Sequence, residues 1–294
     1  MALTGALIAI LAASIWSFSM VIAKRGLAGG GTTLQVSLLV AAVDTVVYWG
    51  VLFVLYGTDL TTALTPRAVG IFLVAGIVGT ALGRLASFTG IHRVGASINA
   101  AGISTRPLFA AGLALVILGE PLGLQVGVGI VVLVVGLVVL SISKGGDIRG
   151  WRPRDLLFPL GAAGAFAAAD IIRRFGFTTT PATALHGVTL NETAGVVVLA
   201  AYVATRRRDA FKAVTRRTYG IFLAAGVFNA ISLLLFFIAL EIGPVAVASS
   251  LIGTTPLFTT VFAYVLLGDL ERVTPGVIGG ASLVVVGAVL ITLA

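Results

Sequence analysis

The chain has 294 residues, of which 59% are hydrophobic and only 10% are charged, and it contains no cysteine. A soluble domain has about 25% charged residues to cover its core, so lipid must be the solvent for most of this surface. The composition excludes disulfides, thiol catalysis and zinc–thiolate sites, and the net charge of +8 does not indicate nucleic acid, because the basic residues form short clusters between apolar runs.

Ten apolar runs are each long enough to cross a membrane. A helix needs about 20 residues, at about 1.5 Å per residue, to cross a hydrocarbon core of about 30 Å. Because the runs are continuous, they do not fit the alternating pattern of a membrane barrel. The sequence therefore predicts an all-α integral membrane protein of ten transmembrane helices, with no secretory signal before the first span. The predicted spans are 3–23, 34–56, 69–91, 94–118, 122–142, 155–175, 184–205, 219–240, 244–267 and 273–293.

The second half of the chain repeats motifs of the first half at a nearly constant offset. Gly-Ile-Phe-Leu at 70–73 recurs at 220–223, and Pro-Leu-Phe at 107–109 recurs at 256–258. These matches predict two five-helix repeats, residues 1–148 and 149–294. An odd number of spans places the second copy upside down, which is the inverted-repeat construction of many secondary transporters.

The chain resembles the ten-helix, EamA-type members of the drug/metabolite transporter superfamily. In each half, an extended Pro-Leu-Phe segment ends in Gly119-Glu120 or Gly268-Asp269 and precedes a glycine-rich last helix. The resemblance covers essentially the whole chain and implies a basket of ten helices around a central cavity, alternating access, and movement of metabolites or amino acids, often export. It carries over no catalytic or metal motif, and we interpret Glu120 and Asp269 as helix-end features.

Four ionisable residues are predicted within the central part of the membrane, where each is costly and therefore a functional candidate. They are Asp44, Arg84, Arg106 and Glu192. Asp44 and Glu192 occupy equivalent positions in the two halves, whereas Arg84 and Arg106 align with Leu234 and Thr255. One interpretation is a buried network in which the two acids neutralise the two arginines. The other is a specialised cavity in which an arginine binds an anionic or zwitterionic group.

Other residues within the spans have weaker functional interpretations. Pro107 and Pro256 each remove a backbone donor and predict a kink, which is either inert or a hinge for alternating access. Trp16 is a candidate for the cavity wall, and Thr255 a candidate for substrate binding. Asp170 and His186 are expected in hydrated positions near span ends. Asn99 and Asn229 are interpreted as interhelical hydrogen-bonding residues.

The fifth and tenth spans each begin with a GxxxG spacing. This spacing predicts close packing between these two spans. The glycines concerned are Gly123, Gly127, Gly276 and Gly280.

These features together predict a secondary active transporter of a small polar metabolite, an amino acid or another anionic or zwitterionic solute. The alternative is a membrane-embedded enzyme acting on a lipid or lipid-linked substrate, for which the sequence offers neither clustered carboxylates nor a phosphate-binding loop. The expected partners are the solute and the bilayer of the cytoplasmic membrane, with no cofactor and no nucleic acid, and the chain is expected as a monomer or weak homodimer. Proton coupling through Asp44 or Glu192 stays open.

Orientation is indicated differently by the charges and by the resemblance. Of the 19 basic residues, 14 lie in loops that follow odd-numbered spans and three in loops that follow even-numbered spans, and the other two are Arg84 and Arg106 within the membrane. Because cytoplasmic loops carry the excess of Lys and Arg, the charges place both termini outside. The resemblance implies both termini inside. We follow the charges, because the asymmetry is large and the loops are short.

Overall fold

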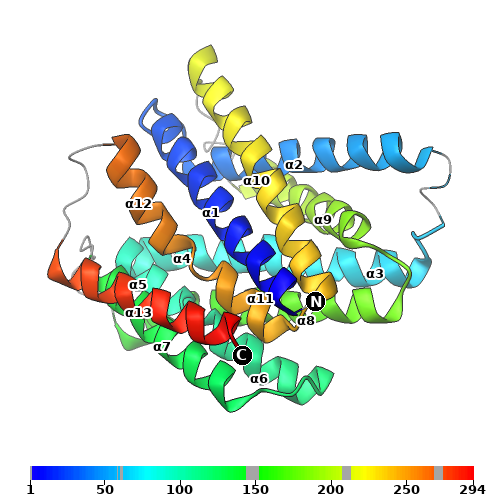
Figure 1. Cartoon of the computed structure of the whole chain (residues 1–294). Helices are drawn as coiled ribbons and strands as arrows, with labels where there is room; N and C mark the ends of the chain where they lie inside the picture. Colours follow the sequence, from blue (N-terminus) through cyan, green and yellow to red (C-terminus); the bar gives the residue numbers. More distant parts are fainter. Residues whose placement is uncertain (1, 58, 60–61, 144–151, 207–212, 268–273) are drawn as a thin grey trace.

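The computed structural model describes residues 2–57, 59, 62–143, 152–206, 213–267 and 274–294 (Figure 1). All ten predicted spans are helical, and ten helical stretches are long and apolar enough to cross a membrane. Six spans are single helices, and five of them are α1 (Ala2–Leu27), α2 (Thr33–Tyr56), α7 (Leu124–Ser143), α9 (Ala184–Arg206) and α13 (Pro275–Thr292). The eighth span, α10 (Arg216–Ile242), is also unbroken, and the sixth joins the short η4 (Pro153–Leu156) to α8 (Leu157–Thr179).

The other three spans are built from segments. The third comprises α3 (Pro66–Ala75), the π-helical η2 (Gly76–Gly83) and α4 (Arg84–Val94). The fourth comprises α5 (Ala96–Ile103), α6 (Arg106–Leu113) and η3 (Ala114–Leu118), and the ninth comprises α11 (Val245–Ile252) and α12 (Thr255–Leu267). No strand occurs among the residues that the structure describes.

Threonine side chains define where several spans begin. The hydroxyl oxygens of Thr65, Thr215 and Thr274 each accept a hydrogen bond from a backbone N–H in the first turn of the following helix. Thr32 forms a reciprocal capping box with Gln35 at the start of α2. Such caps satisfy backbone donors that would otherwise lack partners, so these residues fix the span boundaries.

The two halves interlock through a pseudo-two-fold set of helix contacts. Helix α1 packs along α10, and its counterpart α8 packs along the third span. Helix α2 packs on α10, and in the same way its counterpart α9 packs on η2. Three further contacts join an element to its own counterpart in the other half: α2 with α9, α6 with α11, and α7 with α13. Each half therefore completes the core of the other, and an odd number of spans per half puts the symmetry axis in the membrane plane.

Two repeated motifs contact each other across this axis. Gly26 lies against the ring of Phe222, and the equivalent Gly176 lies against the ring of Phe72, so that a Cβ at either glycine would collide with the ring. Both phenylalanines are fully buried. The repetition of these residues in the sequence thus reflects one packing contact that is made twice.

Spans 5 and 10 pack closely along a seam of glycines that includes the predicted Gly276 and Gly280 of span 10 but not the predicted Gly123 and Gly127 of span 5. A Cβ at Gly136 would lie 2.6 Å from the backbone nitrogen of Val284, and one at Gly280 would lie 2.6 Å from that of Leu140. Gly129 and Gly287 extend the same seam. The prediction for Gly123 and Gly127 is wrong, because a Cβ at Gly123 would meet nothing within 4 Å and one at Gly127 only Leu122 of its own segment. At the other end, Gly276 lies against Ser143.

Spans 4 and 9 are interrupted just before their prolines. Helix α5 ends at Ile103 and α6 begins at Arg106, and likewise α11 ends at Ile252 and α12 begins at Thr255. Pro107 and Pro256 follow directly, in the first turn of α6 and α12, where a missing backbone donor costs least. The kinks expected at the two prolines are thus breaks at equivalent places in both halves.

Candidate solute-binding site

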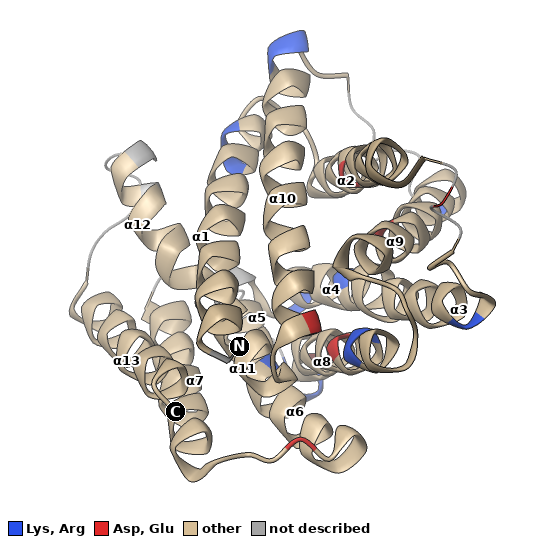
Figure 2. Cartoon of the chain, turned by 45° about the vertical axis from the view of Figure 1, so that its right-hand side comes forward, with Lys and Arg blue, Asp and Glu red and all other residues tan. Residues whose placement is uncertain are grey.

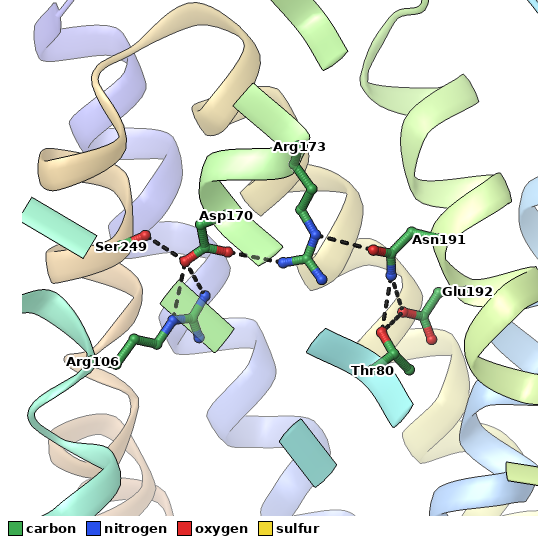
Figure 3. A network of polar contacts seen from close by, with 7 residues as sticks. All are labelled: Thr80, Arg106, Asp170, Arg173, Asn191, Glu192 and Ser249. Carbon is green, nitrogen blue, oxygen red and sulfur yellow. Dashed lines mark hydrogen bonds and ion pairs between the residues drawn. The ribbon is translucent and has the colours of Figure 1, made fainter. Parts of the chain in front are cut away.

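Asp170 lies at the centre of a polar network inside the membrane-spanning region (Figure 3). Its Oδ2 accepts hydrogen bonds from Arg106 Nη2 at 2.6 Å, Arg106 Nε at 3.1 Å and the Ser249 hydroxyl at 2.6 Å. Its Oδ1 accepts one from Arg173 Nη1 at 2.9 Å. The Asp170 side chain is 0% exposed, so the prediction of a hydrated position near the end of span 6 is wrong.

Arg106 is held by protein groups on every side. It pairs with Asp170 and not with Asp44 or Glu192, so the predicted network of those four residues does not form in that arrangement. Its guanidinium lies over the rings of Phe166 and Phe236, 5.6 and 5.4 Å from their centroids. Only 13% of its side chain is exposed. The guanidinium fork that could receive a solute carboxylate is therefore already occupied by Asp170.

Arg173 extends the network from span 6 to spans 7 and 3. Its Nε donates to Asn191 Oδ1 at 3.1 Å, and Asn191 Nδ2 donates to Thr80 Oγ1 and to Glu192 Oε1, both at 2.9 Å. The Thr80 hydroxyl also donates to Glu192 Oε1 at 2.9 Å. Glu192 Oε2 is buried and has no hydrogen-bond partner in the described part of the chain. One oxygen of this carboxylate is thus fixed and the other is free.

Asp44 reproduces this arrangement in the first half. Its Oδ2 accepts a hydrogen bond from Asn229 Nδ2 of α10 at 2.7 Å, and its Oδ1 is buried without a partner among the described residues. Each acid is therefore held by a polar residue from the other half, Asp44 by Asn229 and Glu192 by Thr80. The charges of Asp44 and Glu192 act on one another across the α2–α9 contact.

Arg84 is the third component of this region, and it stands apart from the network of Asp170. It begins α4, directly after the π-helical η2. Its charge acts on Asp44, yet it forms no hydrogen bond and no ion pair with any described residue. The side chain is half-buried. An arginine at this depth that has no protein partner indicates access to water or to an anionic ligand.

Local sequence explains how η2 places Arg84. Gly76 lies against the carbonyl of Asn191, and Gly79 and Gly83 lie against Ala169 and Phe166. These three glycines let span 3 approach α8 and α9 more closely than side chains would allow. A π-helical stretch is wider than an α-helix and shifts the residues that follow around the helix axis. The equivalent stretch of α10 is regular α-helix, so the one-sided arginine coincides with a one-sided backbone feature.

Trp16 and Thr255 lie on spans 1 and 9, which contact each other. Trp16 is partly buried and packs against the main hydrophobic core. The Thr255 hydroxyl donates to the carbonyl of Ile252 at 2.6 Å, while the Thr255 carbonyl accepts from Ser17 at 2.8 Å. The hydroxyl of Thr255 is therefore engaged by its own span.

His186 and Asn99 are buried, each with one polar atom that has no partner among the described residues. His186 Nδ1 lies 2.8 Å from the Thr183 hydroxyl, and its ring centroid lies 4.9 Å from that of Tyr56. The predicted hydrated position of His186 is wrong, since 1% of the residue is exposed and Nε2 is buried without a partner. Asn99 Nδ2 donates to Ser87 at 3.3 Å, between α5 and α4.

A second polar cluster lies on the side of the molecule that carries both termini; we call it the Glu120 cluster. Glu120 Oε1 accepts from Arg174 Nε at 3.3 Å, and Oε2 accepts from the backbone N–H of Val245 at 2.8 Å, at the start of α11. Arg174 also donates to the carbonyl of Glu241 at 2.6 Å. Glu120 therefore caps a helix of the other half. Its counterpart Asp269 lies outside the described residues.

Charged residues at the helix ends lie apart from these interior groups (Figure 2). Lys24 and Arg25 end α1, and Arg216 begins α10. Large apolar side chains such as Val54, Val116 and Leu124 are more than 80% exposed, as expected for a surface that faces lipid.

Comparisons with known proteins agree with this architecture. The model of the EamA-like transporter family matches twice, over residues 3–142 and 155–293. A solved structure titled "Crystal structure of protein" superposes with a TM-score of 0.82 at 16% identity, covering 100% of this chain and 98% of that one. No curated protein matches. The boundary predicted between residues 148 and 149 falls outside the described residues and stays a prediction.

Proposed function

The chain belongs to the EamA-like transporter family, and from that premise we propose that it moves a small polar solute with an anionic group, zwitterions such as amino acids included, across the cytoplasmic membrane. The movement is secondary transport by alternating access, and export is the direction to test first. Because the family consists of transporters, the alternative of a lipid-modifying enzyme loses its support.

One observation carries this proposal: Arg84 is a half-buried arginine within a membrane span that has no protein partner among the described residues. Arg106 and Arg173, by contrast, each form an ion pair with Asp170. A planar guanidinium binds a carboxylate or phosphate through two parallel hydrogen bonds, and such a pair is strong where water is scarce. We therefore propose Arg84, and not Arg106, as the residue that binds the anionic group.

The breaks in spans 4 and 9 support alternating access. They lie at equivalent places, and α6 packs on α11 across the pseudo-two-fold axis. Discontinuous helices of this kind provide backbone joints at which one half can move relative to the other. We propose Pro107 and Pro256 as the hinges.

Asp44 and Glu192 support proton coupling. Each leaves one buried carboxylate oxygen without a partner among the described residues. Glu192 accepts a hydrogen bond from Thr80, four residues before Arg84, and Asp44 lies on α2, which packs on the helix that carries Glu192. A carboxyl group that gains and loses a proton in each cycle would link solute movement to the pH gradient.

Transport of unidentified solutes tests the proposal directly. Purified protein is reconstituted into vesicles loaded with a uniformly 13C-labelled cell extract, and mass spectrometry identifies each labelled solute that leaves faster than from protein-free vesicles. We expect Arg84→Lys to abolish export of the anionic or zwitterionic solutes, because a point charge cannot replace the guanidinium fork. The matched control is Arg93→Lys on the same helix, where the side chain is 59% exposed. An unchanged export profile in Arg84→Lys contradicts the proposal.

A further inference from the structure

The ionisable groups of the interior are balanced in number. Three cations and three carboxylates belong to the described polar region between the two halves. They are Arg84, Arg106, Arg173, Asp44, Asp170 and Glu192. With all six ionised, the sum is zero, and a neutral set is the least costly arrangement for buried charges. Any charge that a solute brings into this region must disturb that balance.

We propose that the solute and an accompanying proton form an electrically neutral load, with Asp44 taking one proton for each negative charge that binds at Arg84. The inference rests on the proposed function and adds to it the number of protons moved per solute charge, the residue that accepts the proton, and the absence of net charge movement. An anionic solute is then carried with one proton for each charge, and a zwitterionic solute is carried with none.

Asp44 is the acceptor because it depends on Arg84. The charged groups that face it are Glu192 from α9, Arg84 from α4 and the phenol of Tyr48 on its own helix. Helix α10 contributes the neutral Asn229, and α1 carries its charges only at its end. When an anion engages Arg84, the anion offsets the positive charge that acts on Asp44, and the negative charge of Glu192 remains. Repulsion between two carboxylates in a poorly hydrated site favours the neutral form of one of them.

The carboxylate of Glu192 is the more completely hydrogen-bonded of the two. Its Oε1 accepts two hydrogen bonds, from Thr80 and Asn191, and Asn191 is in turn bonded to Arg173. Hydrogen bonds to the charged form of a carboxylate favour that form. Asp44 accepts one hydrogen bond, from Asn229, and its free Oδ1 is where the proton is received. In the step, a hydronium ion from the aqueous phase gives its proton to Oδ1 and leaves as water, and the reverse occurs on release.

The loaded vesicles described above test the electrical consequence. Export of each labelled solute is measured with the membrane potential set by K⁺ and valinomycin, and then with a pH gradient at zero potential. Anions should respond to the pH gradient and not to the potential, and zwitterions to neither. If a single negative charge moved without a proton, about 100 mV would change the accumulation ratio about 50-fold. Potential-dependent export of an anion, or a zwitterion that follows the pH gradient, overturns the inference.

A charge-removing variant sharpens the test. With Asp44→Asn the empty site carries one excess positive charge, so a bound anion is balanced without a proton. Export of the anion should then depend on potential and no longer on the pH gradient, whereas Asp59→Asn, an exposed acid in the loop between spans 2 and 3, should behave as wild type. A purely structural role for Asp44 would lower the rate and leave both dependences unchanged. The wild-type measurement decides the question even if the variant is unstable.

The identity of the acceptor is read by infrared spectroscopy. Adding an exported anion to wild-type protein should produce the carbonyl band of a protonated carboxyl group. That band should shift in Asp44→Glu and remain in place in Glu192→Asp. The opposite result assigns the proton to Glu192 and overturns the role of Asp44. If no labelled solute leaves the wild-type vesicles, the proposed function itself fails. If solutes leave but carry net charge, only the present inference fails.

Discussion

Arg106 and Asp170 come from different halves of the chain, and they form the shortest ion pair of the described residues, 2.6 Å between Nη2 and Oδ2. Because Asp170 also accepts hydrogen bonds from Arg173 and Ser249, this single carboxylate joins spans 4, 6 and 9. Arg106 directly follows the break between α5 and α6, and Ser249 lies shortly before the break between α11 and α12. The pair therefore connects the two halves where they are expected to move.

Asp170→Asn should lower the free energy of unfolding strongly and should change solute selectivity little. It leaves Arg106 and Arg173 without a counter-charge, and breaking a buried pair in this way costs about 3–5 kcal/mol. We expect a loss of at least several degrees in the thermal unfolding midpoint in detergent. Arg84→Lys is the contrasting variant, because it should abolish export with little change in the midpoint. Equal midpoints for Asp170→Asn and wild type would contradict the structural role of Asp170.

The interior positions of Asp44 and Glu192 were predicted from the sequence, whereas the interior position of Asp170 was missed. The first two interrupt long apolar runs, and the repeat offset aligns them. Hydropathy treats a cluster of charges as the end of a span, so the predicted sixth span ended at residue 175, whereas α8 continues to Thr179. Asp170 and Arg173 are three residues apart, a spacing that puts opposite charges on one helix face. That signal was available and indicates an internal pair.

Pairing partners and glycine contacts are the parts of the fold that sequence patterns leave open. The GxxxG spacing at Gly123 and Gly127 is a local pattern, and it does not say which helix face meets a neighbour. The observed seam uses Gly129 and Gly136 on α7, seven residues apart, which is two helical turns. The unpaired state of Arg84 depends on the tertiary placement of Asp44, so sequence alone could not separate Arg84 from Arg106.

The glycine seam gives a second prediction. Gly136→Ala should destabilise the protein by about 1–3 kcal/mol, because the added methyl would lie 2.6 Å from the backbone of α13 and overpack the contact. Gly127→Ala on the same helix should be neutral or stabilising by up to about 1 kcal/mol, since the site is open and alanine favours a helix. Thermal unfolding of the two variants in parallel decides this. A similar loss in both would mean that the seam is not where α7 and α13 meet.

The Glu120 cluster gives a third prediction. Glu120→Ala removes a charge-assisted hydrogen bond to Arg174 and the cap on Val245, interactions worth about 1.5–3 kcal/mol each for charged partners. The interior should then open more often toward the side that carries the termini. Because the chain has no cysteine, Ser87→Cys supplies a single, partly buried thiol three residues after Arg84 on α4. Labelling from that side by an impermeant reagent should become about tenfold faster or more.

Two results decide the interpretation of the Glu120 cluster. The control Asp59→Ala removes an exposed acid in the loop between spans 2 and 3 and should leave the labelling rate of Ser87→Cys unchanged. Unchanged labelling in Glu120→Ala as well would show that the cluster caps a helix without holding the two halves closed.

The last prediction concerns orientation, on which the charges and the family resemblance disagree. With Arg173 buried inside the protein, the side that carries the termini keeps only Arg67 and Arg174 near its surface, which strengthens the bias toward the opposite side. A bias of this size in short loops places the basic side in the cytoplasm and both termini outside. Cysteines introduced one at a time at Thr62 and Ala213, both exposed, report on the two sides. In intact cells, an impermeant thiol reagent should label the Cys at 62 and not the Cys at 213, and permeabilised cells provide the control in which both react. Labelling at 213 alone would contradict the predicted orientation, and the side that carries the termini would then face the cytoplasm with only two basic residues near its surface.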